Sequence, residues 1–295
     1  MTTRRSWQTD ALTLHDLDDL YERIRQLTPN SEVIGTGKSS DTTEVSQKIK
    51  NMIMLELKES GSRVRIDDVL MILGALAGFS IQMAIRDHFV RLGKMSLQQA
   101  FVVIETKDGG TYFFGDTINE GIVSPHPKQL ALWSFVGGAA QHAGAKELPN
   151  LEDIFVHVSR SIATPQFGLP RLPPENTPRE RPIDLLNKFW NPIRNYMALN
   201  VQSAGLWPFI LGNSTQLAII EARDAIDPAL AAKIVMEVAI PMSKVDPRLI
   251  LHAEIGPRKS PEPSPSAAKS PDVTGRAFEE QSAPRRIFGR RQTPL

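Results

Sequence analysis

Residues 69–85 read Val-Leu-Met-Ile-Leu-Gly-Ala-Leu-Ala-Gly-Phe-Ser-Ile-Gln-Met-Ala-Ile and carry no charged side chain. Asp67 and Asp68 precede the run and Gly93 follows it, so the sequence predicts one helix over 67–92. Because this helix is apolar on every face until Arg86, it belongs either at the centre of a protein core or in a bilayer. The uncharged run is at the short end of the ~17 to 25 residues that a membrane span needs. We predict a buried core helix and keep a span through 69–85 as the alternative.

Two glycines within this run indicate how it packs. Gly74 and Gly78 form a G-x-x-x-G pair, which places two residues without side chains on one face of the helix. Small residues at this spacing let a second helix approach closely, in soluble proteins and in membranes alike. The sequence therefore predicts a tight helix contact at this face.

Amphipathic helical patterns lie on both sides of the run. The predicted helices cover about 14–27, 42–60, 127–143 and 150–163, and then 185–197, 208–226 and 228–240, the last ended by Pro241. Residues 100–106 and 111–114 are rich in β-branched and aromatic side chains and are separated by Asp108-Gly109, a strong hairpin signal. We predict a mainly α, multi-helix globular bundle with one small antiparallel β-hairpin.

Proline-rich segments divide the chain. Residues 164–182 contain six prolines and are predicted to be an extended connector, either a linker or a strap. From Gly256 the chain holds seven prolines and few core-forming residues, which predicts a disordered tail. We therefore expect one helical domain over 1–255, with the connector on its surface, and a tail over 256–295. Two helical subdomains separated by the connector remain the alternative.

The tail concentrates positive charge. It has eight Lys/Arg against four Asp/Glu, a net charge of +4. Because the whole chain has a net charge of +1, residues 1–255 have a net charge of −3. Its basic-aromatic peptide suggests contact with an acidic partner or an anionic surface, and its contact residues are Arg285, Arg286, Phe288, Arg290 and Arg291. The alternative is a solubilising tail end without a target.

The stretch Val33-Ile34-Gly35-Thr36-Gly37-Lys38-Ser39-Ser40 ends like a phosphate-binding loop. In such a loop Gly37, Lys38 and Ser39 would cradle phosphate and hold magnesium. However, Glu32 stands where the first glycine of the motif belongs, and no strand precedes the loop. We predict a flexible loop with capping residues and no nucleotide cofactor.

Polar and aromatic residues gather between the hairpin and the 127–143 helix. If the chain has a ligand pocket, we expect it here, with the residues Tyr112, Asp116, Asn119, His126 and Trp133. Asp108, Asp116, Glu120 and His126 are also the best candidates for a divalent-cation cluster, but turn acids are usually caps or solvated side chains, so we predict no metal. Core packing explains the tryptophans better than base stacking does, so we do not expect nucleic acid as a partner.

No coherent catalytic set is evident in the sequence. There is no cysteine, no G-x-S-x-G elbow and no H-x-x-x-H pair among the six histidines. No apolar signal segment follows the N-terminus, which predicts a soluble, cytoplasmic protein. Our first hypothesis is a non-catalytic interaction or scaffold protein whose partner is another protein or a second copy of the chain. The alternatives are a small-molecule-binding domain or enzyme with its site near the hairpin, and a membrane-associated protein.

Overall fold

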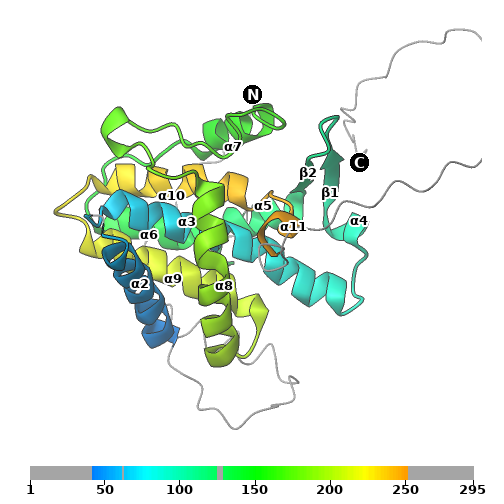
Figure 1. Ribbon diagram of the computed structural model, residues 1–295, viewed down its shortest axis with the longest axis horizontal. Coiled ribbons are helices and arrows are strands. Elements are labelled where there is room, and N and C mark those ends of the chain that lie inside the picture. The colour runs from blue at the N-terminus through cyan, green and yellow to red at the C-terminus, as the bar shows by residue number, and fades with distance from the viewer. Residues whose placement is uncertain (1–41, 62, 125–128, 252–295) are drawn as a thin grey trace, which may run out of the picture. The chain divides into compact units, whose positions relative to one another are not determined.

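The computed structural model describes residues 42–61, 63–124 and 129–251. They form a mainly helical fold with one two-stranded antiparallel sheet, which confirms the predicted fold class (Figure 1). The predicted helix at 14–27, the phosphate-loop-like stretch and the tail lie outside the described residues. The elements are α2 (Thr42–Glu59), α3 (Ile66–Ile85), a π-helical turn (Arg86–Arg91), α4 (Leu97–Ala100), β1 (Val102–Glu105), β2 (Thr111–Phe114), α5 (Asp116–Ile122), α6 (Leu132–His142), α7 (Leu151–Arg160), α8 (Pro182–Asn200), α9 (Trp207–Glu221), α10 (Pro228–Met242) and α11 (Pro247–Leu251).

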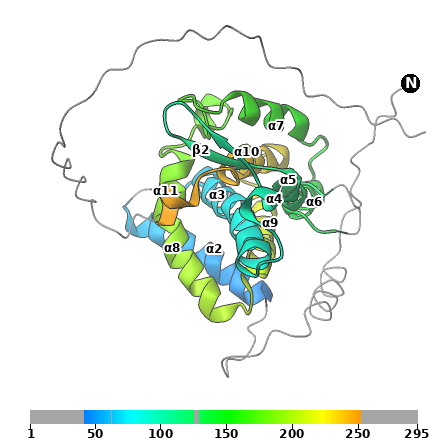
Figure 2. The same cartoon turned by 90° about the vertical axis from the view of Figure 1, so that its right-hand side faces the viewer.

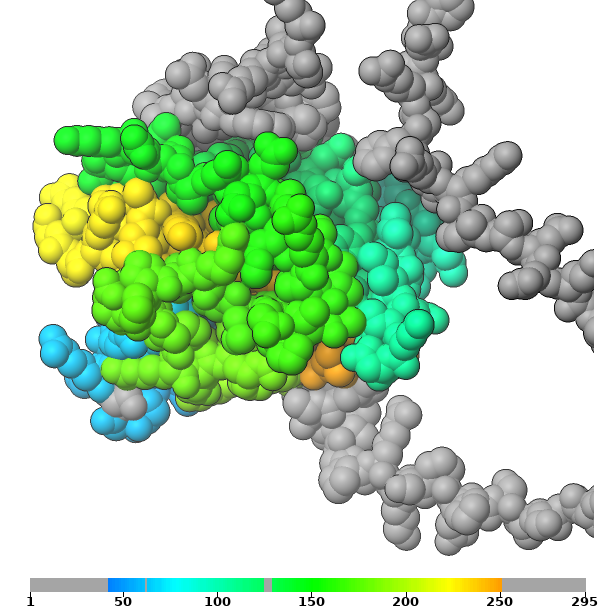
Figure 3. All heavy atoms as spheres, turned by 90° about the horizontal axis from the view of Figure 1, so that it is seen from above, coloured from blue at the N-terminus to red at the C-terminus, as the bar shows by residue number. Residues whose placement is uncertain are grey.

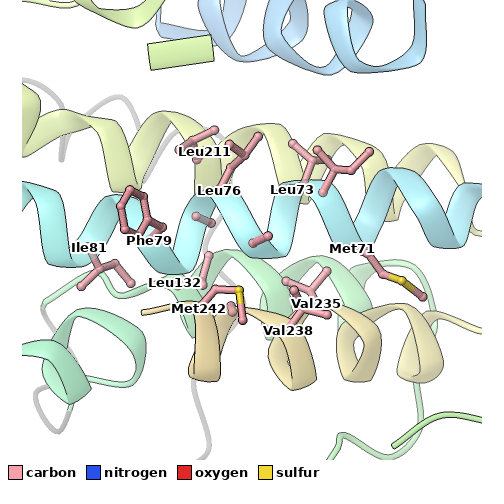
Figure 4. Close-up of a cluster of buried hydrophobic side chains, with 14 of the residues drawn as sticks. Met71, Leu73, Leu76, Phe79, Ile81, Leu132, Leu211, Val235, Val238 and Met242 are labelled. Atoms are coloured by element: carbon pink, nitrogen blue, oxygen red, sulfur yellow. The ribbon is translucent and has the colours of Figure 1, made fainter. Parts of the chain in front are cut away.

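Helix α3 is the centre of the hydrophobic core. It packs against α8, α9 and α10, which surround it in Figure 2. Figure 4 shows its side chains between Leu211 of α9 on one side and Val235 and Val238 of α10 on the other. Within the described residues, Ile66–Arg91 is the one helix long and apolar enough to cross a membrane, and 94% of its most apolar window is buried among the other elements.

The two glycines of α3 set how closely α10 approaches. A Cβ atom added to Gly74 would lie 2.8 Å from the backbone oxygen of Val235, and one added to Gly78 would lie 2.1 Å from that of Ala239. Both atoms belong to the main chain of α10, which cannot rotate away as a side chain can. The two helices therefore meet backbone to backbone, as the G-x-x-x-G spacing predicts.

We predict that Gly78→Ala destabilises the protein by about 3 kcal/mol, at the upper end of the usual cost of overpacking, because the new methyl group can fit only if α3 and α10 move apart. Gly138→Ala in α6 is the matched control, since its Cβ atom would have nothing within 4 Å. That control should gain up to about 1 kcal/mol from the better helix propensity of alanine. Urea unfolding measures both. Equal effects of the two substitutions would contradict the backbone contact.

The proline-rich connector is held against the core by a buried acid. Glu237 of α10 is 2% exposed, and its carboxylate pairs with Arg171 of the connector at 2.9 Å. The same guanidinium pairs with Asp153 of α7 at 2.8 Å. In the space-filling view of Figure 3, green residues of the connector region lie across this face, next to the yellow residues of α10. The connector is therefore tied to two helices at one point.

A second set of contacts holds the connector to the start of α3. Asn176 donates to Asp67 at 2.7 Å, and Arg65 donates to the backbone oxygen of Glu175 at 2.8 Å. Arg179 donates to the backbone oxygen of Arg63 at 3.1 Å. The hydrophobic core also contains residues from α2 and α3, before the connector, and from α8, α9 and α10, after it. The described helices on the two sides of the connector thus share one core.

We predict that Arg171→Met costs about 3 to 5 kcal/mol of stability, because it leaves the buried carboxylate of Glu237 without a counter-charge. Asp153→Asn removes the charge of the other partner of Arg171. Because the side chain of Asp153 is 62% exposed, this substitution should cost less than about 1 kcal/mol. The double variant Arg171→Met with Glu237→Gln should recover part of the loss. Chemical denaturation of the three variants checks this order, and similar losses for the two single variants would refute it.

The hairpin is confirmed, and the elements beside it correct several predicted boundaries. Strands β1 and β2 pair antiparallel, with Val103 opposite Phe113. The long predicted helix over 67–92 is α-helical only to Ile85 and then continues as the π-helical turn. The segment after the hairpin, expected as a turn, forms α5, and α10 runs one residue past Pro241. Proline removes one N–H from the last turn of α10 and its ring crowds the carbonyl four residues earlier, and the helix ends at Met242, directly after it.

Candidate functional site: a groove between helices α5, α6 and α7

A groove of about 750 Å³ runs between α7 and the adjoining parts of α5 and α6. Its walls are largely apolar and include Trp133 from α6 and Phe155 from α7. Asn119 of α5 also lines the groove. The full lining is Asn119, Val123, Trp133, Leu148, Pro149, Asn150, Leu151, Glu152, Phe155, Val156, Ser159 and Arg160.

The helix signals of α7 explain how it comes to form one wall. Asn150 caps the helix by accepting a hydrogen bond from the N–H of Asp153 at 3.2 Å. Ile154 and Val158 are buried at helical spacing and attach α7 to the core. Phe155 is half-buried and Val156 is 39% exposed, so the neighbouring stripe of the same helix is left to line the groove.

The structure brings together two of the five residues predicted for a pocket. Asn119 and Trp133 both line this groove. Tyr112 lines a separate, smaller cavity of about 180 Å³ beside the connector. Asp116 is exposed at the first position of α5, and His126 lies outside the described residues.

The predicted metal candidates do not meet in the described part of the chain. Within those residues no group of three histidine or acidic side chains could hold a metal ion. Asp108 instead accepts a hydrogen bond from Thr106 in the hairpin turn, and this bond lowers the pKa of its carboxyl. The turn acid therefore acts here as a local cap.

A buried lysine lies behind the groove. Lys244 follows α10 and is 1% exposed. The side chain of Gln82 donates to the backbone oxygens of Ser243 at 2.9 Å and Val245 at 3.1 Å. The backbone N–H of Phe113 donates to the backbone oxygen of Lys244 at 2.9 Å. The turn is thus tied to α3 on one side and to β2 on the other, and the Lys244 side chain reaches α5 in the interior.

The ammonium group of Lys244 has a neutral hydrogen-bond partner. Its Nζ atom donates to Oδ1 of Asn119 at 2.7 Å and lies 5.4 Å from the ring centroid of Phe114. Within the described residues it makes no ion pair. Burial without a counter-charge lowers the pKa of Lys244 to about 7.

Two other buried charged residues show that the lack of an ion pair at Lys244 is unusual. Lys50, 2% exposed, pairs with the carboxylate of Glu221. Asp246 is two residues from Lys244, but its carboxylate is bound by Arg248 at 2.6 Å. A buried charge is normally paired, so an unpaired lysine next to a groove marks a candidate functional residue.

Sequence reasoning missed Lys244 and the α7 wall. Lys244 follows the apolar run of residues 238–242 after a single serine and precedes Val245, and this was a usable signal. That it lacks a carboxylate partner depends on the tertiary fold, because Asp246 is close in sequence but is held by Arg248. Similarly, Phe155 and Asn119 are 36 positions apart in the numbering and meet only through helix packing.

Comparison of the chain with protein-family models, with curated proteins and with solved structures finds no match. The chemistry of the groove is therefore the basis for inferring function.

We predict a specific pH dependence of stability from Lys244. Between pH 7 and about 10 the unfolded state retains the lysine proton while the folded state releases it, so the free energy of unfolding rises with pH. Lys244→Met removes this dependence and should stabilise the protein at pH 7 and below, by a few kcal/mol at most. Its advantage over the wild type should shrink as the pH rises from 7 to 9.5.

Denaturant unfolding of both proteins at matched pH values provides the measurement. The difference between the two proteins isolates Lys244 from the other groups that titrate in this range. A difference that stays constant from pH 7 to 9.5 would show that Lys244 keeps its ordinary pKa.

Proposed function

We propose that the groove binds a small molecule with a mainly apolar body. The observation that carries this proposal is the combination of largely apolar walls with the side chain of Asn119, backed by a buried lysine. The second asparagine of the lining, Asn150, is engaged as the cap of α7. Ligand sites are typically concave spaces of about 300 to 1,000 Å³ with apolar walls and a few polar groups that orient the ligand. The groove of about 750 Å³ fits this description.

The described polar groups of the groove favour binding over chemistry. The Ser159 hydroxyl donates to the backbone oxygen of Phe155 at 2.9 Å, so it is engaged with its own helix. Glu152 and Arg160 are exposed at the rim. A nucleophile needs a base within hydrogen-bond reach, and none of these contacts supplies one. The proposal is therefore a binding protein.

Interaction through the basic tail remains a separate prediction, because Arg285 and its neighbours lie outside the described residues. Cytoplasmic localisation likewise remains a prediction. The groove carries the small-molecule proposal independently of both.

We expect the uncharged fluorophore N-phenyl-1-naphthylamine to bind the full-length protein, with enhanced emission in the groove. Val156→Arg places a charge on the apolar wall and should weaken this binding at least about tenfold. Leu199→Arg is the matched control, because Leu199 is 86% exposed on α8 and does not line the groove. It should leave the affinity unchanged.

A fluorescence titration of the three proteins decides the matter. Absence of binding to the wild type would overturn the proposed function. Equal weakening by Val156→Arg and Leu199→Arg would show that the fluorophore binds elsewhere.

A further inference from the structure

The hydrogen bond from Lys244 orients the amide of Asn119. In its protonated form Lys244 has three donors and no acceptor, so it must then face the carbonyl oxygen of the amide and not the NH2 group. The 2.7 Å contact between Nζ and Oδ1 agrees with this requirement. The NH2 end of Asn119 makes no hydrogen bond within the described residues, and because Asn119 lines the groove, we take this end as the one available to a ligand. The groove therefore offers a donor at this point.

The buried charge strengthens that donor. Hydrogen bonds in a chain polarise one another, so an amide whose oxygen accepts from an ammonium group donates more strongly through its nitrogen. The side chain of Lys244 is buried and Phe114 lies beside it, so little water screens the charge. A ligand oxygen at the NH2 group of Asn119 would feel both the donor and the positive charge behind it.

The other charges on the groove do not reverse this preference. The described charged residues of its lining are Glu152 and Arg160 of α7, one of each sign, and both are exposed. Exposed charges are screened by water and salt. The sign of the inner end is consequently set by Lys244, which lacks an anionic partner in the described part of the chain.

We propose that the ligand of this groove is an organic anion, a carboxylate on an apolar chain or ring, whose carboxylate accepts a hydrogen bond from Asn119 in front of Lys244. The apolar part then lies along Trp133 and Phe155. This inference rests on the proposed function, because it specifies the head group of a ligand for the same groove.

Three ten-carbon ligands that differ only in the head group test the proposal on the wild-type protein. Decanoate, decanol and decylammonium are each used to displace N-phenyl-1-naphthylamine at pH 6, where Lys244 is mostly protonated and a carboxylate is still ionised, and below their aggregation concentrations. Decanoate should bind at least about tenfold more tightly than decylammonium, and more tightly than decanol. Equal affinities, or a preference for decylammonium, would overturn the anion proposal. Failure of the fluorophore itself to bind would instead overturn the proposed function.

Asn119→Asp supplies a near-isosteric second test. The new carboxylate pairs with Lys244 and presents negative charge to the groove, so decanoate binding should fall at least about tenfold. Binding of the uncharged fluorophore should persist, which shows that the groove is intact. Leu199→Asp adds the same charge on the exposed face of α8 and is the control, with decanoate binding unchanged. Undiminished decanoate binding in Asn119→Asp would contradict the role given to this amide.

Discussion

The contact between the main chains of α3 and α10 determines how the rest of the structure is arranged. Gly74 and Gly78 leave no side chain between the two helices, so α10 lies directly on the central helix. Because the helices are held in one register, the end of α10 projects to the hairpin, where Gln82 of α3 binds the following turn. The position of Lys244 beside α5 follows from that register.

Helix α10 and the turn after it bury three charged side chains, and two of them, Glu237 and Lys244, have very different partners. Glu237 is neutralised by Arg171, and this pair fastens the proline-rich connector to the core. Among the described residues, the one hydrogen-bond partner of the Lys244 ammonium is the amide of Asn119. Burying an unpaired ammonium group weakens the folded state, and Lys50 shows that this protein can pair a buried lysine with a carboxylate. The lack of such a pair beside the groove is explained if the partner is a ligand.

The sequence revealed much of the fold but only part of the site. The apolar run of α3 and the Asp-Gly hairpin were predictable because their signals are local. Helix α5 was missed because it is short and buries only Ile118 and Ile122. Asn119 and Trp133 were foreseen as neighbours of one pocket, and both line the groove. Lys244 and Phe155 were not, because their places depend on helix packing across the chain.

The most direct test of this account is an NMR titration of the Lys244 side chain in full-length protein labelled with 13C-lysine, using Lys244→Met to assign its signal. We predict a pKa of about 7 in the free protein and a higher value with saturating decanoate, because an anion in the groove stabilises the protonated lysine. An ordinary pKa near 10.4 in the free protein, or a value unaffected by bound decanoate, would contradict the account.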